Sequence, residues 1–206
     1  MVYSRREMII GCRFFMTRLL AVLGLCILAF SWGTGIQERN DYNREEALKV
    51  IHLLEKIQME SLRSPSTRPS RKAVVTENQL NDYIAYRIES EKEEILRELR
   101  LKIFSRKKIE GRILIDLGNE PIPQILNPEM VLYFAGSLET KGQAVRLHLD
   151  SLFLGEQAIQ PEILDLIMAI AAGAQNEVAG TLNDWWKLPY GIRDIETDKE
   201  KLWLFY

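Results

Sequence analysis

The stretch Met130–Gly155, "MVLYFAGSLETKGQAVRLHLDSLFLG", consists of two apolar runs joined by the polar segment "TKGQ". The second run alternates apolar and polar residues: Val145, Arg146, Leu147, His148, Leu149 and Asp150. A period of two with one polar face is typical of antiparallel sheet, and Gly142 suits the backbone of a tight turn. The stretch therefore predicts a β-hairpin with one buried face.

The alternation slips by one residue at Asp150–Ser151, after which Leu152 and Leu154 carry the apolar pattern. An extra residue in a strand is the pattern of a β-bulge, which bends and twists the strand. Alternating runs at 99–103 and 109–117, together with a terminal hairpin at 192–206, predict further strands. We expect the terminal turn at Thr197–Lys199, and a last strand, 202–206, that is covered on both faces because both are apolar.

The segment "PEILDLIMAIAAGAQ" (161–175) is apolar in every helical direction, and Asp165 is its only charge between Leu164 and Ala174. Pro161 suits a first helical turn, and we expect the helix to run to about Leu182. A helix without a polar face is covered by other parts of the protein or by a membrane. Its apolar part is shorter than the about 20 residues that span a bilayer, so we expect the sheet to cover it.

Two more helices are expected earlier in the chain. Residues 37–63 show an amphipathic stripe. A second helix follows Val74, because Thr76 and Gln79 have the spacing of a capping box. Its apolar face consists of Leu80, Tyr83, Ile84 and Ile88. Between the two helices, residues 64–73 predict a basic linker rich in Ser and Pro, since its prolines cannot continue a helix.

Residues 1–31 combine four arginines, an apolar run at 19–30 and small residues around Ala29 and Ser31. This order predicts a cleaved signal peptide, and hence an exported protein of the periplasm or cell envelope. The alternative is an uncleaved membrane anchor, although residues 31–35 are too polar and small for the end of a spanning helix. Residues 1–31 hold both cysteines, four Arg and one Glu, so cleavage leaves no disulfide and moves the net charge from −2 to −5.

The sequence gives no positive reason to predict an enzyme. The acidic balance argues against a nucleic-acid-binding protein. The sequence has no nucleophile elbow, phosphate-binding glycine loop or Cys/His metal spacing, and His52 and His148 have no partners at ligand spacing. We therefore expect no enzyme activity, no catalytic residue, no metal site and no cofactor.

The segments "TENQLNDYI" (76–84) and "LPYGIRDI" (188–195) frame the predicted strands and the apolar helix. This arrangement resembles bacterial envelope proteins of the tubular lipid-binding type, which include the YceB-like and LmeA-like exported proteins. The first segment resembles their opening "TE-x-x-LN-x-Y" helix, and the second resembles their proline turn into the final strands. The resemblance covers about residues 74–206. It implies an α+β fold with a strongly curved antiparallel sheet wrapped around a long apolar helix, and it leaves residues 37–63 unexplained.

The resemblance implies that the protein binds a lipid or another apolar envelope molecule in a groove between helix and sheet. The groove residues expected are Leu164, Ile167, Met168, Ile170 and Ala171 on the helix, and Leu147, Leu149, Leu152 and Phe153 on the sheet. Each of them also suits an ordinary core. The alternative is therefore an envelope structural or assembly module with a filled core and no ligand, and a hydrolase with a non-standard site ranks third. The basic linker is a weaker candidate for contact with a membrane surface, and protein partners are left open.

Overall fold

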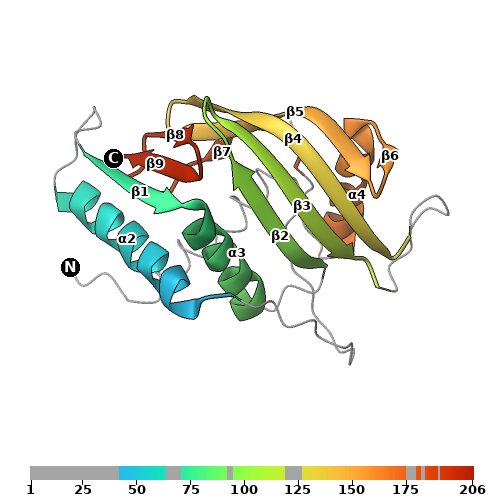
Figure 1. Ribbon diagram of the computed structural model, residues 1–206, viewed down its shortest axis with the longest axis horizontal. Helices are drawn as coiled ribbons and strands as arrows, with labels where there is room; N and C mark the ends of the chain where they lie inside the picture. Colours follow the sequence, from blue (N-terminus) through green and yellow to red (C-terminus); the bar gives the residue numbers. More distant parts are fainter. Residues whose placement is uncertain are drawn as a thin grey trace.

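The computed structural model describes residues 42–63, 71–91, 95–118, 127–174, 180–181, 184–189 and 191–206. They form an α+β structure in which a strongly curved antiparallel sheet is flanked by helices and by a smaller sheet (Figure 1). The α+β class and the curved antiparallel sheet, both expected from the sequence, are confirmed. The signal peptide or anchor expected at residues 1–31 lies outside the described residues.

The larger sheet has six strands, in the order β2-β3-β4-β5-β6 with β7 also paired to β5. Its strands are β2 Leu96–Ile103, β3 Lys108–Asp116, β4 Glu129–Lys141, β5 Ala144–Leu154, β6 Gln157–Ala158 and β7 Trp186–Lys187. β4 and β5 form the expected hairpin, and Gly142 and Gln143 in its turn have φ values of 58° and 66°. Positive φ at both turn residues is the type I′ geometry, which matches the twist of the paired strands.

The predicted bulge in β5 is confirmed by its pairing with β4. The register shifts between Ala135 and Gly136, which leaves Asp150 as an extra residue in β5. A Cβ at Gly136 would lie 2.4 Å from the carbonyl oxygen of His148, so the two backbones approach closely here and require glycine. A bulge bends its strand and increases the local twist of the sheet.

The smaller sheet has three antiparallel strands in the order β1-β9-β8. Its strands are β1 Lys72–Thr76, β8 Asp194–Asp198 and β9 Lys201–Phe205. The expected terminal hairpin is confirmed, but its turn consists of Lys199 and Glu200, while Thr197 and Asp198 of the predicted turn still belong to β8. The expectation that the last strand is covered on both faces is met only in part: Leu204 is buried, whereas Trp203 and Phe205 on the other face are half-buried. The Lys72 ammonium lies over the Trp203 ring, 4.8 Å from its centroid, in place of a packed layer.

Strand β1 differs from the sequence-based prediction, which assigns Lys72 and Ala73 to the linker at 64–73. Arg71 and Tyr206 exchange backbone hydrogen bonds of 3.1 and 3.0 Å, and β1 continues this pairing along β9. The predicted linker therefore does not extend to residue 73. Its last two residues belong to β1, which forms because β9, far away in the sequence, lies opposite it. Residues 64–70 lie outside the described residues.

Helix α3 (Glu77–Glu91) begins at the predicted capping box. The backbone N–H of Gln79 donates to Thr76 Oγ1 at 3.2 Å, and Gln79 Oε1 accepts from the backbone N–H of Thr76 at 3.1 Å. Each side chain thus satisfies a backbone donor that the first turn leaves without a helical partner. The predicted apolar face of this helix is buried: Leu80, Tyr83, Ile84 and Ile88.

The same helix closes the free edge of β2. The Asn81 side chain accepts from the N–H of Leu101 at 2.8 Å and donates to the carbonyl of Leu101 at 2.9 Å. The Glu77 carboxylate accepts from the N–H of Ile103 at 2.7 Å. An open edge strand is a template for pairing with another chain, and these side chains occupy its backbone groups.

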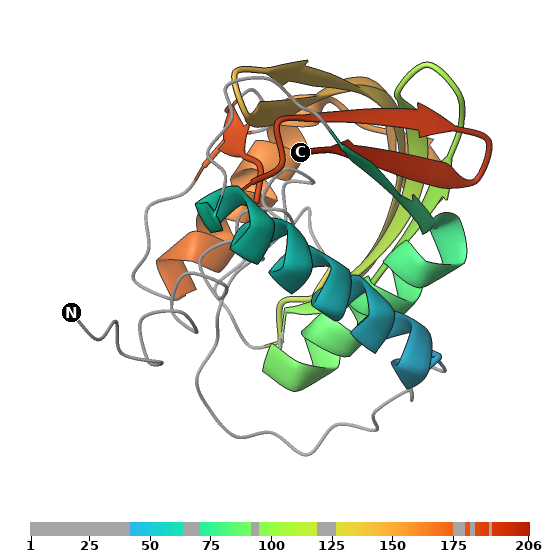
Figure 2. The same ribbon diagram turned by 90° about the vertical axis from the view of Figure 1, so that its left-hand side faces the viewer.

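Helix α2 (Arg44–Arg63) packs against α3 and belongs to the same folded unit (Figure 2). Its residues Ala47, Val50 and Ile57 are buried. The amphipathic helix expected at 37–63 is therefore present from Arg44 onward. Asn43 caps its first turn, because Asn43 Oδ1 accepts from the backbone N–H of Glu45 at 3.0 Å. Residues 37–41 lie outside the described residues. The predicted linker does not separate α2 from the unit expected at 74–206.

Helix α4 (Pro161–Ala174) is the predicted apolar helix, but it ends before the predicted limit at Leu182. Gly180 and Thr181 are not helical. The backbone N–H of Thr181 donates to Asp184 Oδ2 at 2.7 Å, and the N–H of Asp184 donates to the carbonyl of Thr181 at 3.1 Å. These local bonds form a turn that competes with a helix at this point. None of the described helices has the length and apolar character needed to span a membrane.

We expect Asn81→Ala to lower the free energy of unfolding by about 2 kcal/mol, because it leaves the N–H and C=O of Leu101 without their side-chain partners. Urea unfolding followed by circular dichroism measures this loss. Asn78→Ala is the matched control: the same substitution on an exposed position of α3, with an expected change within about 0.5 kcal/mol. Equal effects of the two variants would show that Asn81 does not secure the edge of β2.

Candidate functional site

The predicted binding site depends on the buried side of the larger sheet, which we call the inner face. It is formed by the buried residues Leu99, Leu101, Ile103, Ile109, Ile113, Ile115, Met130, Leu132, Phe134, Val145, Leu147 and Leu152. Figure 2 shows the sheet curving around this side. Alternation along four strands thus produces one continuous apolar surface, as the period of two predicts.

Three of the predicted groove residues on the sheet lie on the inner face. Leu147 and Leu152 are buried, and Leu149 is half-buried against the same apolar cluster. The bulge at Asp150 makes this possible, because without the extra residue Leu152 would point to the opposite face from Leu149.

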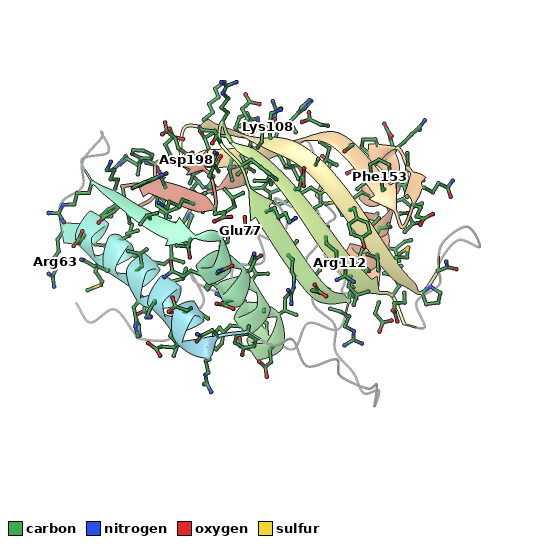
Figure 3. The ribbon with its side chains drawn as sticks, viewed as in Figure 1. Arg63, Glu77, Lys108, Arg112, Phe153 and Asp198 are labelled. Atoms are coloured by element: carbon green, nitrogen blue, oxygen red, sulfur yellow. The ribbon has the colours of Figure 1, made fainter. Side chains whose placement is uncertain are left out.

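Phe153 does not lie with them, and its assignment to the groove is wrong. It is 38 % exposed on the outer face, where it pairs directly with Tyr133, which is 44 % exposed (Figure 3). The reason is the same alternation: Leu152 and Leu154 point inward after the bulge, so the residue between them points outward.

The predicted groove residues on α4 join the same buried cluster. Leu164, Ile167 and Met168 are buried, with Ile167 fully inaccessible, and Ile170 is half-buried against the cluster. The side chain of Ala171 lies outside what the structure describes. Inner face and α4 therefore form one apolar interior, and its described side chains pack together as a core does.

One cavity lined by described residues lies elsewhere, between the start of α2, one face of α3 and the edge of β2. Its volume is about 260 Å³. Its lining is Tyr42, Asn78, Asn81, Asp82, Ala85, Ile88, Glu98, Leu99 and Arg100. None of these residues was expected from the sequence to line a site. The signal for them is a mostly polar stripe on α3 at positions 78, 81, 82 and 85, which has the spacing of one helix face.

Most charged groups around this cavity are paired with each other. Glu98 accepts from Arg112 at 2.6 Å and forms an ion pair with Arg100 at 3.0 Å. The hydrogen bond to Glu98 raises the pKa of Arg112. Asp82 Oδ1 accepts from the backbone N–H of Asn43 at 3.0 Å. The cavity is thus a polar junction between α2, α3 and β2, and none of the described residues that line it is a serine, threonine, cysteine or histidine.

Tyr42 lies at the α2 side of this junction and donates a hydrogen bond to the Glu89 carboxylate. Burial, and next the hydrogen bond to Glu89, raise the pKa of Tyr42 from 10.0 to about 12. Its ring meets that of Tyr86 edge-on, with centroids 6.2 Å apart. The phenol therefore stays protonated and links the start of α2 to α3.

Metal chemistry has no candidate centre in the described part of the chain, where no three His, Cys, Asp or Glu side chains gather. His52 on α2 and His148 on β5 are both exposed. Comparison with protein-family models, with curated proteins and with solved structures gives no match for this chain. The apolar interior between α4 and the inner face is therefore the candidate site.

We expect the Tyr42 phenol to titrate near pH 12 and to hold α2 in place only while it is protonated. Because folding raises this pKa, the stabilisation is complete below about pH 10 and is lost as the pH rises to about 12. Absorbance titration at alkaline pH, compared between the wild type and Tyr42→Phe, measures the pKa. If the variant loses a tyrosine of ordinary pKa instead, the contact with Glu89 does not form.

Proposed function

We propose that the protein binds a lipid or another apolar envelope molecule between α4 and the inner face, without catalysis. One observation carries the proposal: the apolar residues of α4 and of four sheet strands form a single interior. An acyl chain placed in such an interior gains about 0.8 kcal/mol for each methylene removed from water. The resemblance to tubular lipid-binding proteins over residues 74–206 supports the same function.

An acyl chain would enter at the margin of this interior. Ile163, Ile170 and Leu154 are half-buried against the cluster, and Leu166 on α4 is 39 % exposed. Apolar side chains that are partly wet gain the most from a hydrocarbon ligand, because binding removes their remaining surface from water. We propose entry along α4, with export to the periplasm or envelope as the setting.

The second candidate function is an envelope assembly module with a filled core. The observation in its favour is the close packing of Leu164, Ile167 and Met168, all of which are buried. Its partner surface would include the exposed Met59 and Leu62 near the end of α2. This candidate predicts that no ligand accompanies the protein.

We expect a lipid to co-purify with the protein when it is isolated without detergent. Mass spectrometry of an organic extract, with a mock purification from cells lacking the protein as control, identifies it. A clean extract together with no binding of solvatochromic acyl probes would reject the lipid proposal in favour of the filled-core module.

We expect Ile167→Asp to lower the free energy of unfolding by several kcal/mol, because it buries an unpaired carboxylate in the apolar interior. The matched control is Leu166→Asp on the neighbouring exposed position of α4, with an expected cost below about 1 kcal/mol. Thermal unfolding of the two variants gives the comparison. Similar midpoints would mean that the interior does not close around Ile167.

A further inference from the structure

A buried hydrogen-bond donor without a partner lies at one end of the inner face. Among the side-chain nitrogen and oxygen atoms buried in the described residues, Trp186 Nε1 is the one that has no hydrogen-bond partner. Buried polar groups in folded proteins are nearly always bonded, so such an atom calls for an explanation. Trp donates only, so the missing partner is an acceptor.

The strand pairing places this indole on the inner face. Trp186 of β7 lies directly opposite Val145 of β5, and residues that are opposite each other in an antiparallel pair share a face. Val145 is buried, and Leu147, two residues along the same strand, is one of the groove residues. The unpartnered donor therefore adjoins the interior in which we place the ligand.

Local packing fixes the position of the ring. A Cβ at Gly180 would lie 2.5 Å from Trp186 Cη2, so this glycine lets the backbone touch the six-membered ring. The Asp184 carboxylate lies close to the same glycine, but it accepts from Thr181 Oγ1 at 3.2 Å and from the Thr181 N–H at 2.7 Å. The contact with Gly180 thus restrains the indole ring, and the hydrogen bonds of the Asp184 carboxylate go to Thr181.

The donor also lies at one end of the larger sheet, because its partner Val145 is the second residue of β5. The preceding Trp185 is 37 % exposed, and the Arg146 guanidinium lies 4.6 Å from the centroid of its ring. An amphiphile bound with its hydrocarbon along the inner face would bring its polar end to this boundary. A carbonyl oxygen at the first carbon of an acyl chain meets both requirements.

We propose that the ligand is an acyl compound whose carbonyl oxygen accepts a hydrogen bond from Trp186 Nε1. This inference rests on the proposed function and narrows its ligand class, from apolar molecules in general to fatty acids and their esters. A site with a buried donor discriminates against analogues that lack the acceptor, because the donor is then left unpaired.

Two fluorescent probes test this in the full-length protein: cis-parinaric acid, which has an acyl carbonyl, and diphenylhexatriene, a hydrocarbon without an acceptor. We expect Trp186→Phe to weaken parinaric acid binding about tenfold and to leave diphenylhexatriene binding unchanged. Trp185→Phe, the same substitution on the exposed neighbour, is the matched control and should change neither. Unchanged diphenylhexatriene binding also shows that the variant is folded.

A second measurement uses the wild-type protein and therefore does not depend on the folding of a variant. The indole N–H resonance of Trp186 in the wild type should move downfield when parinaric acid binds and stay in place with diphenylhexatriene. If both probes bind and Trp186→Phe weakens both equally or neither, or if the resonance does not respond, the carbonyl inference is overturned while the proposed function stands. If neither probe binds the wild type, the proposed function fails and this inference with it.

Discussion

The continuous apolar face on four antiparallel strands must be kept from water, and the other elements are arranged to meet that need. Burial of apolar surface stabilises a fold by about 25 cal/mol for each Å² removed from water, so leaving such a face open would cost more than a domain's net stability. The bulge at Asp150 curves β5 and keeps Leu149 and Leu152 on one side. The apolar helix α4 then joins the interior with Leu164 and Ile167.

Side-chain hydrogen bonds join the two sheets, whose described strands do not pair with each other. Lys107, at the turn between β2 and β3, donates to Thr140 of β4 at 2.6 Å and to Asp194 of β8 at 3.2 Å. The Thr197 hydroxyl on β8 donates to the carbonyl of Phe104 at 2.6 Å. These side chains bridge strands of different sheets. They hold the smaller sheet beside the larger one, although no strand of one sheet pairs with a strand of the other in the described part of the chain.

Local patterns in the sequence were sufficient for the features that are themselves local. The capping box needs only Thr76 and Gln79, the hairpin turn needs Gly142, and the bulge follows from a one-residue slip at Asp150. Once the bulge is known, the outward direction of Phe153 follows as well, so its assignment to the groove was an error of register.

Features that depend on distant partners could not be predicted in the same way. Lys72 and Ala73 form a strand only because Phe205 and Leu204 lie opposite them, over a hundred residues later. The polar cavity likewise needs α2, α3 and β2 together, whereas the polar stripe on α3 by itself indicates only a solvated face. The composition of a segment does not indicate which distant strand it pairs with, and many segments of similar polarity remain linkers.

The distribution of contacts differs between the two sides of the interior, and this difference bears on the proposed ligand entry. On the α3 side, directed hydrogen bonds from Asn81 and Glu77 fix the edge of β2, and such bonds tolerate little displacement. On the other side, α4 from Pro161 to Ile170 has only Glu162 and Asp165 as ionisable residues, and apolar contacts hold most of it. Apolar contacts are non-directional, so side chains there can repack around a hydrocarbon chain at lower cost. The proposed ligand entry at α4 is therefore compatible with an unchanged α2–α3–β2 side.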